Sequence, residues 1–182
     1  MLLTRSGMRL GAGGFARMFF LFFFVTTPAL AQAPHVRSER GMQRLVDDAA
    51  QRSSVIREWI DRLEEMDVTV YVRARVFTQL DLDGRIGLLS VARGHRFLVI
   101  ELACGRSELS QMATLGHELF HAIEIAEEPS VVSTATLADL YSRIGIQIGD
   151  HTGRRTFETE AAAAAGLRAR RQLLGTRTGH GT

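Results

Sequence analysis

The chain has 182 residues, of which 46% are hydrophobic, and it carries 22 basic and 20 acidic side chains. Three arginines, Arg5, Arg9 and Arg17, lie within the first 31 positions, where there is no acidic residue, so the rest of the chain has 19 basic and 20 acidic groups. This near-neutral balance removes the electrostatic argument for nucleic-acid binding, and the length is that of one ordinary domain.

The N-terminus has the pattern of a secretory signal peptide over residues 1–31. Its arginines precede an apolar run at 18–25 (MFFLFFFV), which is too short to cross a bilayer as a stable helix. Pro28 ends the run, and Ala29-Leu30-Ala31 supplies the small residues that signal peptidase requires. We therefore expect cleavage after Ala31 and export to the periplasm or the outside of the cell, without stable membrane insertion. The alternative is an uncleaved N-terminal anchor.

The segment 32–40 is polar, and we predict a solvated leader there. From Gly41 to Met66 apolar residues recur at spacings of three and four, which indicates an amphipathic helix. Ser53-Ser54 offers a break that would divide this segment into two helices.

Three segments then have the character of strands. Apolar and polar residues alternate over 67–79, and the segments 86–92 and 97–103 flank a turn signal at Arg93-Gly94. We predict that these strands form an antiparallel meander. The lone Cys104 has no partner for an internal disulfide and is predicted to be a small buried residue.

The rest of the chain is predicted to be mainly helical. We expect helices over 107–127, with Ser107 as N-cap, over 136–144 and over 156–174, with a Gly-rich loop at 145–155. The polar residues 175–182 are predicted to be a disordered tail. This order predicts a single α+β domain over 41–174, in which a small antiparallel sheet packs on the helices.

The segment His117-Glu118-Leu119-Phe120-His121 carries the clearest chemistry. On a helix, residues four apart emerge about 40° from one another, so His117 and His121 can share one zinc ion. Glu118 then lies beside the metal, where its carboxylate can take a proton from a metal-bound water. The helix is otherwise rich in apolar residues, in which two imidazoles and a carboxylate are costly without partners.

A catalytic zinc site needs a third protein ligand. The segment 157–162 (FETEAA) offers Glu158 and Glu160, which lie about 200° apart on a helix, so only one can face the metal. We predict Glu158, because it shares a stripe of small residues that would pack inward. Glu124 lies about 10.5 Å along the axis from His117, and we predict that it supports a ligand or pairs with an arginine rather than binds the metal.

A group that stabilises an oxyanion is less determined. Tyr141, His151 and Arg154 all lie between the two predicted ligand segments, and each is of a type that can stabilise an oxyanion. The predicted catalytic set is therefore Glu118 with Tyr141 and His151 as candidates, and Arg154 remains an alternative.

The HELFH segment and the later Glu158 resemble the HExxH zinc metallopeptidases of the gluzincin type. The metzincin pattern does not fit, because Glu124 and Glu127 replace its Gly and its final His. The resemblance implies a zincin-like fold, one zinc ion per chain and a peptide or protein substrate. It also implies that the strand 97–103 borders the cleft and pairs with an extended peptide.

The leading hypothesis is a zinc-dependent hydrolase, with a peptidase as its most specific form. A hypothesis of another class is a non-catalytic, zinc-dependent binding or sensor module that keeps the zincin fold. A third hypothesis is a structural protein in which the His and Glu side chains only pair with one another.

Overall fold

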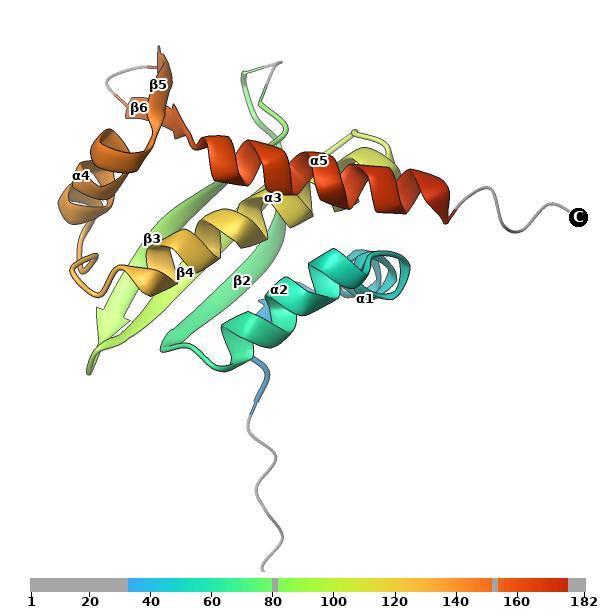
Figure 1. Ribbon diagram of the computed structural model, residues 1–182, viewed down its shortest axis with the longest axis horizontal. Coiled ribbons are helices and arrows are strands. Elements are labelled where there is room, and N and C mark those ends of the chain that lie inside the picture. Colours follow the sequence, from blue (N-terminus) through green and yellow to red (C-terminus); the bar gives the residue numbers. More distant parts are fainter. Residues whose placement is uncertain (1–32, 80–81, 152–153, 177–182) are drawn as a thin grey trace, which may run out of the picture. The chain divides into compact units, whose positions relative to one another are not determined.

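The computed structural model describes residues 33–79, 82–151 and 154–176, without the side chains of 150–155. The predicted signal peptide, its cleavage site and residues 177–182 lie outside the described residues, and the described residues from Ala33 onward form one compact unit. The elements in chain order are β1 (Val36–Ser38), α1 (Gln43–Arg52), α2 (Ser54–Glu64), β2 (Val68–Arg75), β3 (Gly84–Ala92), β4 (His95–Ala103), α3 (Glu108–Glu127), α4 (Thr134–Ile144), β5 (Ile146–His151), β6 (Arg154–Glu158) and α5 (Glu160–Gly175) (Figure 1). The predicted α+β class is confirmed.

The four-stranded sheet is mixed, with the strand order β1-β2-β4-β3. β1, β2 and β4 run parallel, and β3 is antiparallel to β4, so the predicted antiparallel meander is wrong. β3 and β4 are joined by a tight turn at Arg93-Gly94, whose φ angles of 52° and 84° suit a hairpin. The longer connection between β2 and β3 lets β3 lie beyond β4, at the edge of the sheet. β4 therefore pairs with β2 and runs parallel to it.

β4 is an interior strand. It is paired with β2 along one edge and with β3 along the other, and all residues from Leu98 to Ala103 are buried. β4 has no free edge, so the expectation that 97–103 borders a cleft and pairs with an extended peptide is wrong; β1 and β3 are the edge strands. Cys104 is exposed, because it lies in the turn that follows β4, so its predicted burial is also wrong.

The predicted solvated leader is part of the fold. Val36 of β1 is only 9% exposed and pairs with Val70 of β2. The preceding residue, His35, is buried as well, and its backbone N–H donates to the Glu64 carboxylate at the end of α2. The domain therefore begins before residue 41, because β1 pairs with β2 and the preceding backbone is bound by the Glu64 carboxylate.

The helix break predicted at Ser53-Ser54 and the N-cap predicted at Ser107 are confirmed. Ser53 ends α1 and accepts a hydrogen bond from the Ile56 N–H as the N-cap of α2. Ser107 caps α3 in the same way. At the other end of α3, the buried Arg96 of β4 donates to the carbonyls of residues 125, 126 and 128. This guanidinium fixes the end of α3 to the sheet.

The segment after α4 differs from its prediction. β5 and β6 form an antiparallel hairpin where a Gly-rich loop was expected, and α5 begins at Glu160 instead of 156. Glu158 is the last residue of β6, so its placement on a helix was wrong. The strand character was hidden because the glycines and the charged residues of 149–155 interrupt the alternation of apolar residues.

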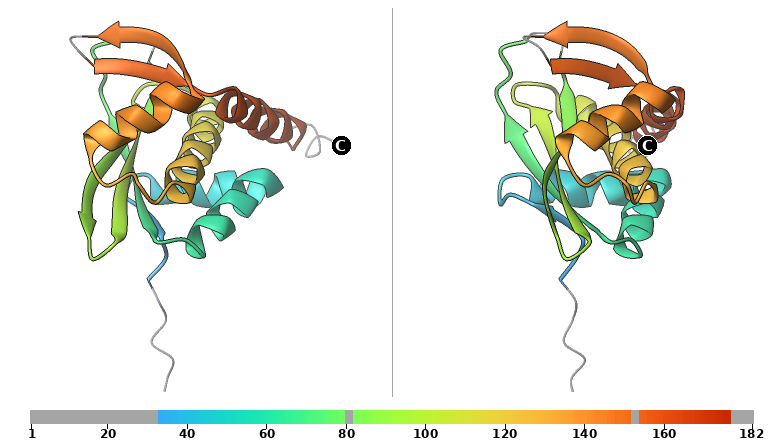
Figure 2. Two further views of the ribbon diagram at one scale, coloured as in Figure 1. Left: turned by 60° about the vertical axis from the view of Figure 1, so that its left-hand side comes forward. Right: turned by 90° about the vertical axis from the view of Figure 1, so that its left-hand side faces the viewer.

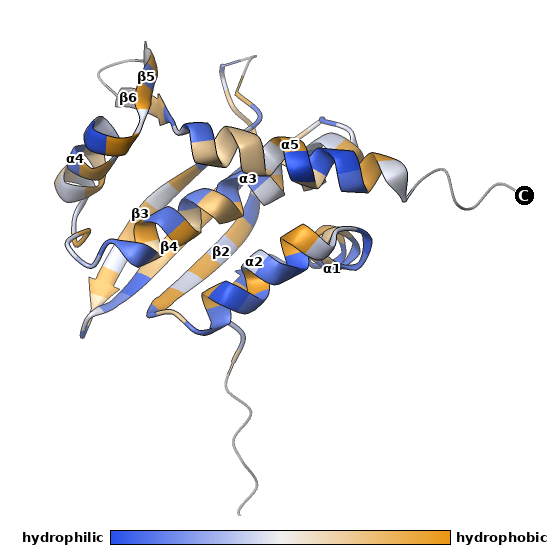
Figure 3. Cartoon of the chain, viewed as in Figure 1, coloured by the Kyte–Doolittle hydropathy of each residue, from blue (hydrophilic) through white to orange (hydrophobic). Residues whose placement is uncertain are grey.

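Helices α1, α2, α3 and α5 lie on one face of the four-stranded sheet (Figures 1 and 2). Figure 3 shows apolar residues along β2, β3 and β4 beneath helices of mixed character. α3 and α5 pack closely, since a Cβ added to Gly116 would lie 2.8 Å from the Ala169 Cβ. The small inward stripe predicted for the last helix is thus confirmed at Ala162, Ala165 and Ala169, which are fully buried. None of the described helices is both long and apolar enough to cross a membrane.

Candidate metal centre

α3 presents two imidazoles on one face, as the spacing of the HELFH segment predicts. The rings of His117 and His121 lie with their centroids 4.8 Å apart. His121 is buried, whereas the His117 side chain keeps 22% of its surface exposed. Glu118 follows on the adjacent side of the helix and is buried as well. An apolar helix therefore holds three polar side chains together, where each needs a charged or polar partner.

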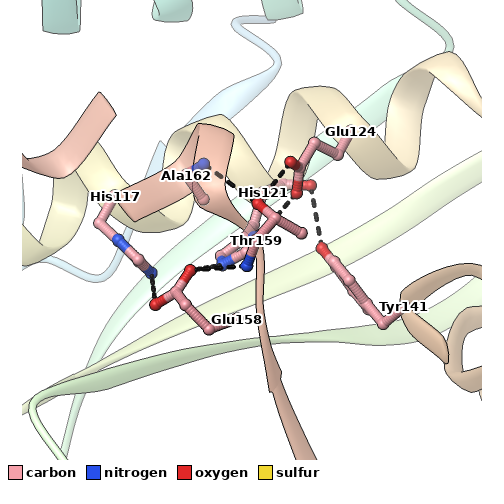
Figure 4. A network of polar contacts seen from close by, with 7 residues as sticks. All are labelled: His117, His121, Glu124, Tyr141, Glu158, Thr159 and Ala162. Carbon is pink, nitrogen blue, oxygen red and sulfur yellow. Dashed lines mark hydrogen bonds and ion pairs between the residues drawn. The ribbon is translucent and has the colours of Figure 1, made fainter. Parts of the chain in front are cut away.

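Glu158 at the end of β6 completes the group. Its Oε2 lies 3.3 Å from His117 Nε2, and its Oε1 lies 3.5 Å from His121 Nε2 (Figure 4). One ligand atom from each of the three residues can be chosen so that all lie within 4.8 Å of one another. Two ligands of a tetrahedral zinc ion, each about 2.1 Å from the metal, are about 3.4 Å apart. The two Glu158–histidine separations are close to this value, and all three side chains are of types that bind zinc.

Each imidazole has a further hydrogen-bond partner besides Glu158. His121 Nδ1 lies 2.7 Å from Glu124 Oε2, which agrees with the prediction that Glu124 supports a ligand. The backbone of Ala162 forms a hydrogen bond with His117 from α5. Gly166 on the same helix leaves room for this ring, because an added Cβ would lie 3.1 Å from His117 Nδ1.

The two histidines differ in charge. Burial disfavours the charged form of His121, but hydrogen bonds with Glu124 and Glu158 outweigh it and raise the His121 pKa to about 9. Burial, together with the charge of His121, lowers the pKa of His117. Burial also opposes ionisation of Glu158, yet its hydrogen bond with His121 and the charge of His117 lower its pKa. For the chain by itself, an imidazolium at His121 therefore lies between two carboxylates.

Glu118 lies between α3 and the edge strand of the sheet. A Cβ added to Gly84, the first residue of β3, would lie 3.2 Å from Glu118 Oε1 and 2.5 Å from the Thr114 Cγ2. Burial raises the pKa of Glu118 to about 7, with a smaller raising effect from Glu158 and a lowering effect from His121. Such a carboxyl group can both accept and donate a proton near neutral pH.

The other candidate residues differ in whether they reach the centre. Tyr141 reaches the centre from α4: its ring lies 5.3 Å from that of His121, and its hydroxyl donates to the His121 carbonyl over 3.4 Å. Burial raises the Tyr141 pKa, so the phenol stays protonated. Glu160, the rejected alternative to Glu158, is exposed in the first turn of α5. The side chains of His151 and Arg154 lie outside the described residues.

Sequence reasoning missed three residues that shape the centre. Thr159 is buried and bonds to Glu124, and the glycines Gly84 and Gly166 leave the space that Glu118 and His117 occupy. Thr159 could have been found as an N-cap signal, because a threonine precedes the alanine-rich run of α5. The glycines carry no such local signal, since their neighbours come from distant parts of the chain.

Comparison with known proteins gives no matching family model, no matching curated protein and no matching solved structure.

Proposed function

We propose that this protein is a zinc-dependent hydrolase of peptide or other amide bonds, with a zincin-like domain that holds one zinc ion through His117, His121 and Glu158. The observation that carries the proposal is the convergence of these three side chains at ligand spacing next to a buried Glu118. Two imidazoles and one carboxylate form a ligand set typical of catalytic zinc, in which a fourth position stays available for water or substrate.

The roles of the side chains follow from their surroundings. Bound zinc would supply Lewis acidity, which polarises a carbonyl oxygen and makes water a stronger acid. Glu118 accepts the proton of the attacking water and delivers it to the leaving amine, and its pKa of about 7 suits both steps. Glu124 holds the ring of His121 through Nδ1, so that Nε2 faces Glu158 and the metal position.

The substrate would lie along β3. This strand is the edge of the sheet on the side of α3, and its first residue, Gly84, lies against Glu118. An extended peptide that pairs with β3 would pass the general base with its backbone in a fixed orientation. β3 thus takes the part that the resemblance to gluzincin-type peptidases assigned to residues 97–103. Export after cleavage at Ala31 remains part of the proposal, which N-terminal sequencing of the secreted protein would test.

The proposal is tested by zinc content and turnover together. Elemental analysis of the purified protein should give close to one zinc per chain, and His121→Ala should lose it. Glu118→Gln should keep the zinc but lower the turnover of a fluorogenic peptide library by about 10²-fold or more. Glu108→Gln, which changes an exposed glutamate in the first turn of the same helix, is the matched control.

Two results would contradict the proposal. If the protein took up no zinc from a zinc-replete medium, the His and Glu side chains of the cluster would only pair with one another. Full activity of Glu118→Gln would exclude this residue as the base. Tight zinc binding without cleavage of any library would instead favour the alternative of a zinc-dependent binding module.

A further inference from the structure

Thr159 connects the three parts of the metal centre. It is 3% exposed and lies between the last residue of β6 and the first turn of α5. Its backbone N–H donates to Glu158 Oε1 over 2.8 Å, and its hydroxyl donates to Glu124 Oε1 over 2.7 Å (Figure 4). The same hydroxyl accepts a hydrogen bond from the Ala162 N–H over 3.0 Å. One residue thus contacts a metal ligand, the partner of a second ligand and the backbone of α5.

The direction of these hydrogen bonds is determined by the donors. A backbone N–H can only donate, so the Ala162 amide occupies a lone pair of the Thr159 hydroxyl. The single hydroxyl proton is then directed at Glu124 Oε1. The other oxygen of that carboxylate, Oε2, faces His121 Nδ1. Both oxygens of Glu124 therefore have defined partners, and the carboxylate has one orientation.

We infer that Thr159 is a positioning residue of the metal centre, which acts on His121 through Glu124 and on Glu158 through its own amide. The inference rests on the proposed zinc site. Thr159 is the N-cap of α5, so the start of that helix is the fixed point from which the orientation of two ligands is set. The rotamer of Glu124, and with it the plane of the His121 ring, depends on a hydroxyl that belongs to a different part of the chain.

The competing explanation is that Thr159 only caps α5. A threonine N-cap stabilises a helix by about 1 kcal/mol and needs no metal for that effect. Capping requires the oxygen of the hydroxyl as an acceptor, whereas the contact with Glu124 requires its proton as a donor. Variants that keep the acceptor but remove the donor therefore distinguish the two roles.

The experiment measures zinc affinity by competition with a chelator, in the full-length protein, for Thr159→Val, Thr159→Asp and Thr159→Ser. Valine has the shape of threonine without its hydroxyl, aspartate caps well but has no proton to donate, and serine keeps both functions. The absorption spectrum of the Co²⁺ form reports ligand geometry independently of activity. Ser107→Ala is the matched control, because it removes the N-cap of α3 far from Glu124.

We expect Thr159→Val to weaken zinc binding by about tenfold, the lower end of effects from partners of metal ligands, and to alter the Co²⁺ spectrum. Thr159→Asp should also weaken it, although its negative charge alone would favour a cation. Thr159→Ser should stay within about threefold of the wild type. In a Glu124→Gln background, Thr159→Val should add less than about twofold, since the two residues act in one chain of contacts.

The inference would be overturned if Thr159→Val and Thr159→Asp changed zinc affinity no more than Ser107→Ala does. It would also be overturned if the effect of Thr159→Val were undiminished in the Glu124→Gln background. If the wild-type protein bound no zinc, the proposed function would be overturned together with this inference. If it bound zinc but the variants had no effect, only this inference would fail. Thermal unfolding in the presence of chelator identifies a variant that has lost its fold. If Thr159→Val has lost its fold, the zinc affinity of Thr159→Asp tests the inference instead.

Discussion

Zinc binding should release about one proton per ion near pH 7.5, and His121 is its source. The pKa of this imidazole is raised to about 9, because Glu124 and Glu158 face its two nitrogens. At pH 7.5 the ring is therefore almost fully protonated, and its Nε2 proton has to leave before that nitrogen can bind a metal. The lowered pKa of His117 means that the other imidazole is already neutral and releases none.

The sign of the pH dependence follows from the direction of this shift. The folded pKa lies above the ordinary value of 6.5, so the ion pairs of His121 stabilise the metal-free fold fully below about pH 6.5. That contribution is lost as the pH rises through about 9. Zinc affinity should move the opposite way, with an increase of about tenfold per pH unit from 7.5 toward 9 and a plateau above it.

Isothermal titration calorimetry in buffers of different ionisation enthalpy measures the proton count directly. Glu124→Gln is the informative variant, because it removes the strongest interaction that raises the His121 pKa. Zinc binding to this variant should release clearly less than one proton per ion at pH 7.5. A wild-type protein that releases no proton, or whose zinc affinity is the same at pH 7.5 and 8.5, would refute this account of the charge of His121.

The remaining predictions concern residues around the site. Gly84→Ala places a methyl group against Thr114 and Glu118, so hydrolysis should fall by about 10²-fold with zinc content unchanged, and Gly84→Ala/Thr114→Ser should recover part of it. Gly166→Ala presses on His117 and should weaken zinc binding by about tenfold in chelator competition, with little loss of metal-free stability. Arg96→Met removes the donor to three carbonyls at the end of α3 and should cost about 3 kcal/mol or more in urea unfolding, whether or not zinc is present.

The local features of the sequence predicted the geometry of the candidate site where one element supplies the residues. His117, Glu118 and His121 lie within two turns of α3, so helical periodicity alone brings them together. The helix break at Ser53-Ser54 and the cap at Ser107 were predictable for the same reason, since each depends on a few neighbouring residues. Choosing Glu158 over Glu160 agrees with the geometry, although the helix assumed for it does not exist.

Features that depend on distant pairing were not predictable in this way. The parallel pairing of β2 with β4 and the pairing of β1 with β2 leave no mark on the alternation within each strand. Gly84 and Gly166 matter because Glu118 and His117 approach them from another part of the chain. The sequence identifies a glycine, but it does not show which side chain fills the space beside it.

The position of Glu158 has a consequence for the kinetics of folding. The centre joins α3 to the start of α5, and Thr159 and Glu124, which are in contact there, are 35 residues apart in sequence. The β3–β4 hairpin, by contrast, closes across a tight turn and can form early. We therefore expect the full ligand set to form only after the C-terminal third has docked, late in folding. Zinc should accordingly slow unfolding in proportion to its binding energy and leave the folding rate nearly unchanged.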